Sequence, residues 1–485
     1  MRYISTRGRA PVLDFEATML TGLARDGGLY VPEEIPQLSH DDLVGLRGAT
    51  YEETAFAVMR PFIGECFTDD EFRGIIQRAY AGFGHTARCP LIQTGPNDWI
   101  LELHHGPTLA FKDVALQLMG QILNMVLSRR GQRATIVGAT SGDTGSAAME
   151  AFRGADQVDV FFLHPAGRIS EVQRRQMTTP VEPNVHAIAL DGTFDDCQAR
   201  VKDMFNDFAF RDDVSLAAAN SINWARVLAQ VVYFVTSAVA LGAPSRAVSF
   251  SVPTGNFGDI FAGQIARRMG VPIDRLIVAT NDNDILHRTL TTGLSEKLGV
   301  VPTLSPSMDI EVSSNFERLL FELYDNDGGA VSQLMDELAT QGRFTLSQGA
   351  LQRLQDGWGS ARADRAQTIE TMRAAARDNG LILDPHTAAG LVGAADQRGD
   401  PAIPMVTLGT AHAAKFPDAV QEATGHRPEL PARMSDLYDR PCGRAARTCG
   451  RAARMSDLYD RPERLTSLPN DLAALQSHIR QECRA

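Results

Sequence analysis

One lysine in the run Gly-Pro-Thr-Leu-Ala-Phe-Lys-Asp at 106–113 is the strongest candidate for covalent chemistry. Lys112 lies between an aromatic side chain and a carboxylate, directly before an apolar run that predicts a helix from Val114 onward. An ammonium group at the edge of a buried helix is unfavourable unless it is neutralised or bonded. A Schiff base with an aldehyde cofactor is the simplest role for such a lysine in an enzyme.

A glycine loop further along the chain has the composition of a phosphate site. The run Pro-Thr-Gly-Asn-Phe-Gly-Asp at 253–259 follows a predicted strand and precedes a predicted helix. Gly255 and Gly258 allow backbone N–H groups to approach a ligand, and the helix N-terminus adds partial positive charge. A plain strand-to-helix turn is the alternative, and this loop alone does not decide between the two.

A second polar loop, Ala-Thr-Ser-Gly-Asp-Thr-Gly-Ser-Ala-Ala at 139–148, also follows a strand and begins a helix. The hydroxyls of Ser141 and Thr144, together with nearby N–H groups, suit a carboxylate. The alternative is that these hydroxyls and Asp143 cap the helix.

A third polar loop, at 407–417, follows another predicted strand. It offers a hydroxyl at Thr410, an imidazole at His412 and a cation at Lys415. As an isolated residue His412 is more often structural. The three strand-end loops together with Lys112 therefore carry the argument for an active site.

The elements around these loops alternate between short apolar runs and amphipathic stretches. Predicted strands span 134–138, 158–163, 185–190, 247–252, 275–280 and 403–408. Predicted helices span 144–152, 170–178, 194–208, 257–269, 284–292 and 415–424. This alternation predicts an α/β fold with mostly parallel sheets covered on both faces. Ligands of such sheets bind beyond the carboxyl ends of the strands.

Composition excludes several classes of partner. The chain has 485 residues, 44% hydrophobic and 22% charged, which suits two or three globular domains. A net charge of −12 argues against nucleic acid. The six cysteines form no CxxC pair, which favours a reducing compartment. The N-terminus lacks a signal-peptide core, and the apolar stretch 224–242 is interrupted by Arg226, so we expect a cytoplasmic protein without a membrane span.

The tail contains a tandem duplication. Ala-Arg-Met-Ser-Asp-Leu-Tyr-Asp-Arg-Pro occurs at 432–441 and again at 453–462. Two copies are too few for a solenoid. We expect one copy to dock and the other to loop out, because surface insertions are tolerated.

The chain resembles threonine synthase, in the branch shared by fungi and many proteobacteria. The resemblance covers roughly residues 1–425 and 468–476. Besides the loops above, it is carried by Tyr-Ile-Ser-Thr-Arg-Gly, Arg-Asp-Gly-Gly-Leu-Tyr-Val-Pro, Asn-Asp-Asn-Asp-Ile-Leu, Ser-Ser-Asn-Phe-Glu-Arg and Thr-Ala-His-Ala-Ala-Lys-Phe-Pro. The departures are Ala413, where many relatives have proline, and the duplicated tail.

The resemblance implies a pyridoxal-phosphate enzyme of fold type II, the three-layer tryptophan-synthase β kind, with a helical N-terminal domain. It implies conversion of O-phospho-L-homoserine and water into L-threonine and phosphate by elimination and hydration, the last step of threonine biosynthesis. Lys112 would hold the cofactor aldehyde, and Thr410 would face the ring nitrogen. The cofactor phosphate would be cradled by Gly255, Asn256, Phe257, Gly258 and Asp259.

The same resemblance suggests which residues hold the substrate. Lys415 and Arg318 are the candidate cations for the substrate phosphate, with Ser314 and Asn315 donating alongside. Arg318 has an alternative, pairing with a glutamate on its own helix. The loop with Ser141 and Thr144 would hold the substrate carboxylate or the cofactor's phenolic oxygen, while Asp143 points at backbone N–H groups.

The implied domains are an N-terminal threonine-synthase-type domain at 1–90, a catalytic region of two α/β subdomains at 91–430, and a C-terminal segment at 431–485. We expect no metal, and a monomer or homodimer. Two alternatives stay open: a related pyridoxal-phosphate phospho-lyase or serine/threonine dehydratase, and a non-catalytic sensor of amino acids or phosphate.

Overall fold

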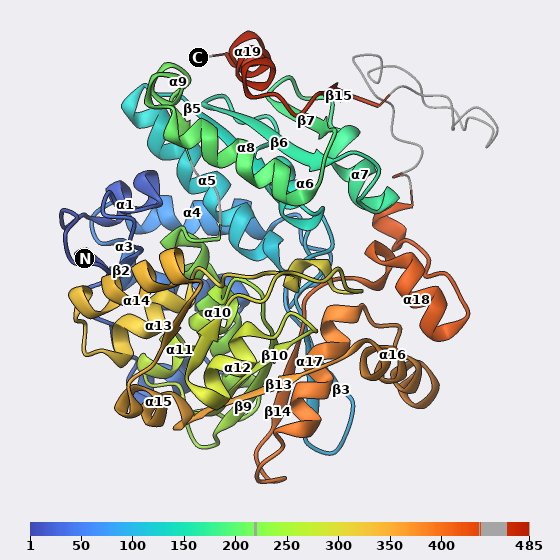
Figure 1. Ribbon diagram of the computed structural model, residues 1–485. Helices are drawn as coiled ribbons and strands as arrows, with labels where there is room; N and C mark the ends of the chain where they lie inside the picture. Colours follow the sequence, from blue (N-terminus) through green and yellow to red (C-terminus); the bar gives the residue numbers. More distant parts are fainter. Residues whose placement is uncertain (218–220, 436, 438–462, 485) are drawn as a thin grey trace. The chain divides into compact units, whose positions relative to one another are not determined.

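The computed structural model in Figure 1 describes residues 1–217, 221–435, 437 and 463–484. Contacts divide the chain into two units, each made of two segments that are distant in sequence. The first unit comprises 1–106 and 221–428, and the second comprises 107–220 and 429–485. The domain ranges predicted above are continuous along the chain and stay a prediction.

The first unit begins with the expected helical region. A short antiparallel pair, β1 (Tyr3–Ser5) and β2 (Tyr30–Pro32), accompanies the helices. The helices are α1 (Phe15–Thr21), α2 (His40–Gly45), α3 (Tyr51–Ile63) and α4 (Asp69–Tyr80). Capping boxes begin α2, α3 and α4, each with a hydroxyl at the N-cap and a carboxylate three residues later.

A six-stranded sheet forms the centre of the first unit. Its order is β13 (Trp358–Arg362), β10 (Ile273–Thr280), β9 (Val248–Pro253), β14 (Met405–Gly409), β4 (Asp98–Glu102) and β3 (Leu91–Gln93). All neighbours are parallel except β3 and β4. The phosphate-loop candidate therefore follows β9, and the Thr410 loop follows its parallel neighbour β14.

Helices cover both faces of this sheet. Gly263 of α11 (Gly258–Arg268) lies so near Leu276 of β10 that a Cβ would come within 2.8 Å of that side chain. Gly393 of α17 (Pro385–Asp396) lies against Ala279, where a Cβ would be 3.0 Å away. Leu276 and Ala279 are three residues apart on one strand, so they point to opposite faces. This gives the predicted three layers.

Helix α10 (Trp224–Ala240) is the apolar stretch noted in the sequence, and it packs against α11 and α3. Its interior residues include the buried Arg226 and Gln230. Across the described ranges, no helix is long and apolar enough to cross a membrane.

The first unit contains further helices and short strands. They are α12 (Ile285–Thr292), β11 (Leu294–Glu296), η1 (Pro306–Met308), α13 (Phe316–Leu323), α14 (Gly328–Gln341), β12 (Arg343–Thr345), α15 (Gln348–Gln355), α16 (Arg365–Asn379), η2 (Ala413–Lys415) and α18 (Pro417–Thr424). Strands β11 and β12 form an antiparallel pair, and α16 packs against both α17 and α18.

The second unit has a five-stranded sheet that is parallel throughout. Its order is β15 (Leu465–Leu468), β7 (Val185–Leu190), β6 (Val158–Pro165), β5 (Ala134–Ala139) and β8 (Leu216–Ala217). Helix α8 (Phe194–Asn206) packs against α19 (Leu472–Glu482). The two helices are far apart in sequence, as their green and red colours in Figure 1 show. These two helices and α9 (Phe208–Asp213) share a core with the sheet that includes Phe161, Ile188, Leu475 and Ile479.

The other helices of the second unit are α5 (Lys112–Arg130), α6 (Asp143–Phe152), α7 (Glu171–Thr178) and η3 (Ala432–Met434). Part of the first repeat copy is described: Met434 and Leu437 are buried with Leu109 and Val172. The second copy, 453–462, lies outside the described residues.

The predicted elements are confirmed. Every strand and helix range given above has its counterpart, with ends that agree within two residues. No predicted strand corresponds to β4, β13 or β15, or to the two- and three-residue strands β1, β2, β3, β8, β11 and β12. Their sequences, such as Trp-Gly-Ser-Ala-Arg, lack the continuous apolar run by which buried parallel strands are identified.

Candidate active site

Lys112 begins helix α5 of the second unit, and its side chain is almost completely buried. The residue is 8% exposed; its Nζ lies 3.8 Å from Oδ2 of Asp143 and 5.4 Å from the centroid of the Phe111 ring. Burial removes water from the ammonium group, and the nearby carboxylate offsets part of that cost. An amine held in this way suits covalent chemistry with a carbonyl group.

Asp113 fixes the turn that precedes Lys112. Its two carboxylate oxygens accept hydrogen bonds from the backbone N–H and the hydroxyl of Thr108, at 2.8 and 2.7 Å. The Thr108 carbonyl in turn accepts from Nε2 of Gln176 on α7, at 3.0 Å. The turn is therefore tied to its own helix and to a neighbouring one.

The loop before α6 is folded by Thr140. Its hydroxyl oxygen accepts from the backbone N–H groups of Gly142 and Gly145, at 2.9 and 2.8 Å. Gly142 has a φ of 131°, which L side chains rarely adopt. Within the described part of the chain, the half-buried hydroxyls of Ser141 and Thr144 make no hydrogen bond, and helix α6 has no side-chain cap. Both hydroxyls are therefore available to a ligand.

Asp143 is bound by side chains. Its Oδ1 accepts from Nε2 of Gln173 at 3.0 Å, while Oδ2 is the oxygen near Lys112. The sequence predicted backbone N–H partners for this carboxylate. Gln173 was missed because it comes from α7, thirty residues away, and no local pattern links it to Asp143.

The glycine loop of the first unit follows the buried strand β9 and leads into α11. Phe257 has a φ of 62°, so the chain turns sharply before Gly258 begins the helix. A Cβ at position 255 would lie 2.6 Å from the carbonyl oxygen of Ser307, so only glycine fits there. The turn leaves the N–H groups at the start of α11 for an anion.

A second loop braces this turn. The hydroxyl of Ser313 donates to the carbonyl of Gly255 at 2.7 Å. The backbone N–H and the side-chain amide of Asn315 both donate to the carbonyl of Asn256, at 3.1 and 2.8 Å. The structure thus brings together two runs that were predicted to serve different phosphates.

Arg318 serves this brace. It is fully buried, and its guanidinium donates to Oδ1 of Asn315 and to the carbonyls of Tyr30 and Ile222. Burial lowers the pKa of Arg318 to about 9. All three of its nitrogens bind protein oxygens, a geometry that favours a structural role over the predicted contact with the substrate phosphate. Arg318 is 0% exposed, so it does not form the alternative ion pair on a helix surface.

The carboxyl group of Asp259 points away from the predicted phosphate cradle. It accepts a hydrogen bond from the hydroxyl of Tyr233 on α10. Burial raises the pKa of Asp259 to about 7, and the hydrogen bond from Tyr233 partly opposes that rise. A charged Asp259 carboxylate would repel a phosphate, so an anion at the start of this helix would be bound by backbone N–H groups and not by the Asp259 side chain.

Thr410 follows strand β14 and is 4% exposed. Its backbone N–H donates to the hydroxyl of Thr387 at 3.2 Å. Its own hydroxyl oxygen is buried and has no hydrogen-bond partner within the described ranges. A buried hydroxyl of this kind is a site for a ligand atom that can bond it.

Two residues behind Thr410 were missed in the sequence. The hydroxyl of Thr387 donates to Asp384, which caps helix α17 and also binds Nδ1 of His386 at 2.8 Å. The signal was present as Asp-Pro-His-Thr before an apolar run, a typical helix start. What the sequence did not show is that this cap orients the loop after a different strand.

The predicted residues divide between the two units. Lys112, Ser141 and Thr144 belong to the second, whereas the 255–259 loop, Thr410, the 314–318 run and Lys415 belong to the first. Lys415 lies in η2 and is fully buried. A buried ammonium requires polar or anionic partners, which suits the end of a strand where a phosphate binds.

Within its own unit, each of these groups has chemistry that suits pyridoxal phosphate. The buried amine of Lys112 suits its aldehyde, and the glycine turn, with a position that excludes a Cβ, suits its phosphate. The unpartnered hydroxyl of Thr410 suits its ring nitrogen.

Family models match most of the chain. The model for the threonine synthase N terminus matches residues 2–80, that for pyridoxal-phosphate dependent enzymes matches 88–342, and that for the threonine synthase C-terminal part matches 387–447.

Full-length relatives agree. Threonine synthase of Pseudomonas aeruginosa is 50% identical over 482 residues, covering 99% of this chain and 98% of that protein. A crystal structure of PLP-bound threonine synthase from Brucella melitensis is 51% identical, with a TM-score of 0.93 and complete coverage of both chains. The yeast threonine synthase structure is 39% identical, with a TM-score of 0.90, covering 99% of this chain and 98% of that one.

Proposed function

The chain belongs to the threonine synthase family, and we propose from its geometry which residues carry out each part of the reaction. The reaction converts O-phospho-L-homoserine and water into L-threonine and phosphate, and the cofactor is pyridoxal 5′-phosphate. The observation that carries the residue assignments is the buried amine of Lys112 beside Asp143.

Lys112 is proposed to bind the cofactor aldehyde and to move protons. When bound, pyridoxal phosphate supplies an electron sink for the bond changes next to the substrate amine. Lys112 Nζ accepts the proton from the substrate Cα and is the group that transfers protons at the adjoining carbon. The Asp143 carboxylate stabilises the resulting ammonium, and Gln173 holds that carboxylate in place.

The turn at Gly255–Gly258 is proposed to bind the cofactor phosphate through backbone N–H groups. Asn256, Phe257 and Asp259 contribute main-chain atoms to this cradle. Ser313 and Asn315 support the cradle by binding the carbonyls on its other side. Thr410 is proposed to bond the ring nitrogen with its otherwise unpartnered hydroxyl.

Substrate recognition is proposed to rest on fewer residues than the sequence suggested. Ser141 and Thr144 bind the substrate carboxylate or the cofactor's phenolic oxygen, and Lys415 binds the substrate phosphate. We now assign Asn315 and Arg318 to positioning, because both are already bonded within the brace. Ser314 lines a cavity that contains none of the other predicted site residues.

The substrate is a small molecule. We also propose that the protein is cytoplasmic and that it is a monomer or a homodimer. The scattered cysteines, which form no CxxC pair, support this location.

Product balance tests the function. The protein supplied with O-phospho-L-homoserine is expected to release threonine and inorganic phosphate in equal amounts. Phosphate without threonine would point instead to a phospho-lyase, and turnover of serine or threonine to a 2-oxo acid would point to a dehydratase. A non-catalytic sensor would bind the substrate and release neither product.

A further inference from the structure

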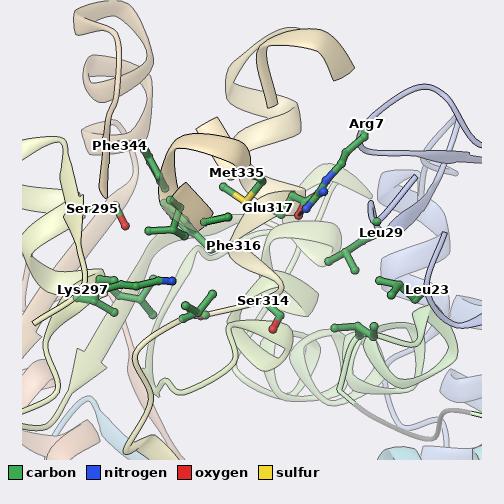
Figure 2. A pocket seen from close by; sticks show the side chains of 18 residues that line it. Arg7, Leu23, Leu29, Ser295, Lys297, Ser314, Phe316, Glu317, Met335 and Phe344 are labelled. Atoms are coloured by element: carbon green, nitrogen blue, oxygen red, sulfur yellow. Dashed lines mark hydrogen bonds and ion pairs between the residues drawn. The ribbon is translucent and has the colours of Figure 1, made fainter. Parts of the chain in front are cut away.

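The first unit contains a cavity of about 290 Å³ that the proposed reaction does not use. Figure 2 shows its lining, which comes from the N-terminal segment, Ile222, α12, β11 and Lys297 directly after it, the loop before α13, α13, α14 and β12. It contains neither the glycine turn nor Thr410 nor Lys415. At about 30 Å³ for each water-sized group, it holds a ligand of about ten non-hydrogen atoms.

Most of the cavity wall is apolar. Leu29, Phe316, Met335, Leu338 and Phe344 are among the side chains that form it. Two further lining residues, Leu23 and Val312, are among the exposed large hydrophobics of the chain, at 47% and 40%. An apolar cavity reached past exposed apolar side chains is typical of a binding site for an aliphatic group.

The charged groups of the cavity are two cations and one carboxylate. Arg7 and Glu317 neutralise one another through two hydrogen bonds of 3.1 and 3.0 Å, and the hydroxyl of Thr6 also donates to Glu317. The third group, the half-buried Lys297, makes no side-chain hydrogen bond or ion pair within the described ranges. Figure 2 shows its nitrogen pointing toward the middle of the labelled side chains.

This charge pattern defines the ligand. One excess cation inside an apolar wall is complementary to a single anionic group on an aliphatic body. A positive charge on the ligand, such as an ammonium group, would find no free carboxylate in the cavity, since Glu317 is already bound by Arg7. We propose that this cavity binds a small aliphatic monocarboxylate, with its carboxylate on Lys297 and its chain among the α13 and α14 side chains.

The site is connected to the cofactor cradle by one short segment. Ser313 and Ser314 line the cavity. Ser313 also binds the carbonyl of Gly255, and Asn315, which follows Ser314, binds the carbonyl of Asn256. A ligand that orders this segment from the cavity side also orders the brace on its other side. Occupancy therefore raises the affinity for pyridoxal phosphate, and by linkage the cofactor raises the affinity for the carboxylate by the same factor.

Octanoate is the probe, because it has ten non-hydrogen atoms and one carboxylate. Calorimetric titration of the holoenzyme is expected to detect octanoate binding that weakens about tenfold or more in Lys297→Met and is retained in Lys297→Arg. The sequence contains lysine only at 112, 202, 297 and 415, so Lys202→Met is a matched control and is expected to bind normally. Octanol binding as tightly as octanoate, or octanoate binding unaffected in Lys297→Met, would overturn the proposal.

Chemical protection gives a second readout that does not depend on a variant folding. Octanoate is expected to slow acetylation of Lys297 in the native holoenzyme, followed by mass spectrometry, and to leave Lys202 unchanged. Equal rates at Lys297 with and without octanoate would contradict the site.

Two measurements separate this proposal from the proposed reaction. Lys297→Met is expected to keep the wild-type kcat and KM for O-phospho-L-homoserine when no octanoate is present; a raised KM would place Lys297 in the substrate site and overturn the inference. Titration of the apoenzyme with pyridoxal phosphate is expected to give a Kd at least about threefold lower in saturating octanoate. An unchanged Kd would overturn the connection to the cradle.

Discussion

Asn315 is bonded twice to one atom of Asn256: its backbone N–H and its side-chain amide both donate to the same carbonyl oxygen, at 3.1 and 2.8 Å. The residue that receives these bonds lies at the centre of the glycine turn. Because the carbonyl of Asn256 is held from behind, the following N–H groups face the other way. The pair therefore converts a flexible turn into a preformed anion site.

The bond between Asn315 and Asn256 can be tested by substitution. Asn315→Ala removes one of the two bonds to Asn256 and also removes one of the three acceptors of the buried Arg318 guanidinium. We expect the affinity for pyridoxal phosphate to fall roughly tenfold or more, since one lost hydrogen bond to a charged group is worth about 1.5–3 kcal/mol. Titration of the apoenzyme followed by cofactor absorbance measures this. Asn379→Ala, at an exposed helix end, is the control, and equal Kd values for both variants would contradict the bracing role.

Lys112→Ala is expected to lower kcat by more than about a thousandfold, because it removes both the covalent anchor and the proposed base. Borohydride reduction of the wild-type holoenzyme should fix the cofactor on the peptide that contains residue 112, which mass spectrometry identifies. Lys202→Ala should retain both properties. Cofactor fixed on another lysine would refute the assignment.

Lys415→Ala tests which cation binds the substrate phosphate. We expect KM for O-phospho-L-homoserine to rise about a hundredfold, as a charge-assisted contact of roughly 2–3 kcal/mol is lost. The Kd for pyridoxal phosphate should change little, and this distinguishes the substrate phosphate from the cofactor phosphate. If the cofactor Kd rises instead, Lys415 belongs to the other anion site.

Asp259 predicts a pH dependence of stability. Its pKa is about 7 in the folded protein and near 3.8 in an unfolded chain, because burial disfavours the charged form. Between these values the unfolded state binds fewer protons, so this group's contribution to stability is fully present below pH 3.8 and is lost as pH rises to about 7.

Asp259→Asn removes that dependence. We compare the free energy of unfolding of the variant minus that of wild type at two pH values. This difference should be larger at pH 8 than at pH 4.5 by roughly 2–4 kcal/mol, measured from urea unfolding curves. Asp274→Asn, a change of the same type on strand β10, is the control. If the difference in free energy of unfolding between the two proteins does not change with pH, Asp259 is charged over the whole range.

The duplicated tail gives a prediction for a deletion. Removing residues 433–453 joins Ala432 to Arg454 and restores one complete copy, with Met455 and Leu458 in place of Met434 and Leu437. Since the same side chains are then supplied to the cluster with Leu109 and Val172, we expect unchanged kcat and unchanged thermal stability. The matching measurement is the Tm of the two holoenzymes, and a marked decrease would show that the duplication has become part of the structure.

The sequence predicted the loops that carry the chemistry better than the side chains that hold those loops in place. Strands β9 and β14 were found because buried parallel strands are continuous apolar runs, and the polar residues that follow them mark the ligand side. The partners of Arg318, the carbonyls of Tyr30 and Ile222, could not be predicted because they come from segments far away in the chain. Backbone carbonyls carry no residue-specific signal, so a buried arginine that binds them looks like a free cation in the sequence.

Asp259 illustrates the same limit at closer range. Its position in the glycine motif suggested a part in the cradle, yet its carboxyl group is bound by Tyr233 of the preceding helix. The direction of a side chain at the start of a helix depends on the neighbouring helix, which the motif does not specify. What the motif did specify was the need for glycine at 255, where the carbonyl of Ser307 leaves no room for a side chain.

Strand β15 and helix α19 complete the second unit from the far end of the chain. Strand β15 lies along β7, and Leu475 and Ile479 fill the core beside Phe161 and Ile188. During synthesis on the ribosome, β7 therefore emerges hundreds of residues before its neighbour, with an open edge and an uncovered apolar face. A polypeptide released before residue 463 would keep that edge exposed, and we expect such truncated products to depend on chaperones and to aggregate without them.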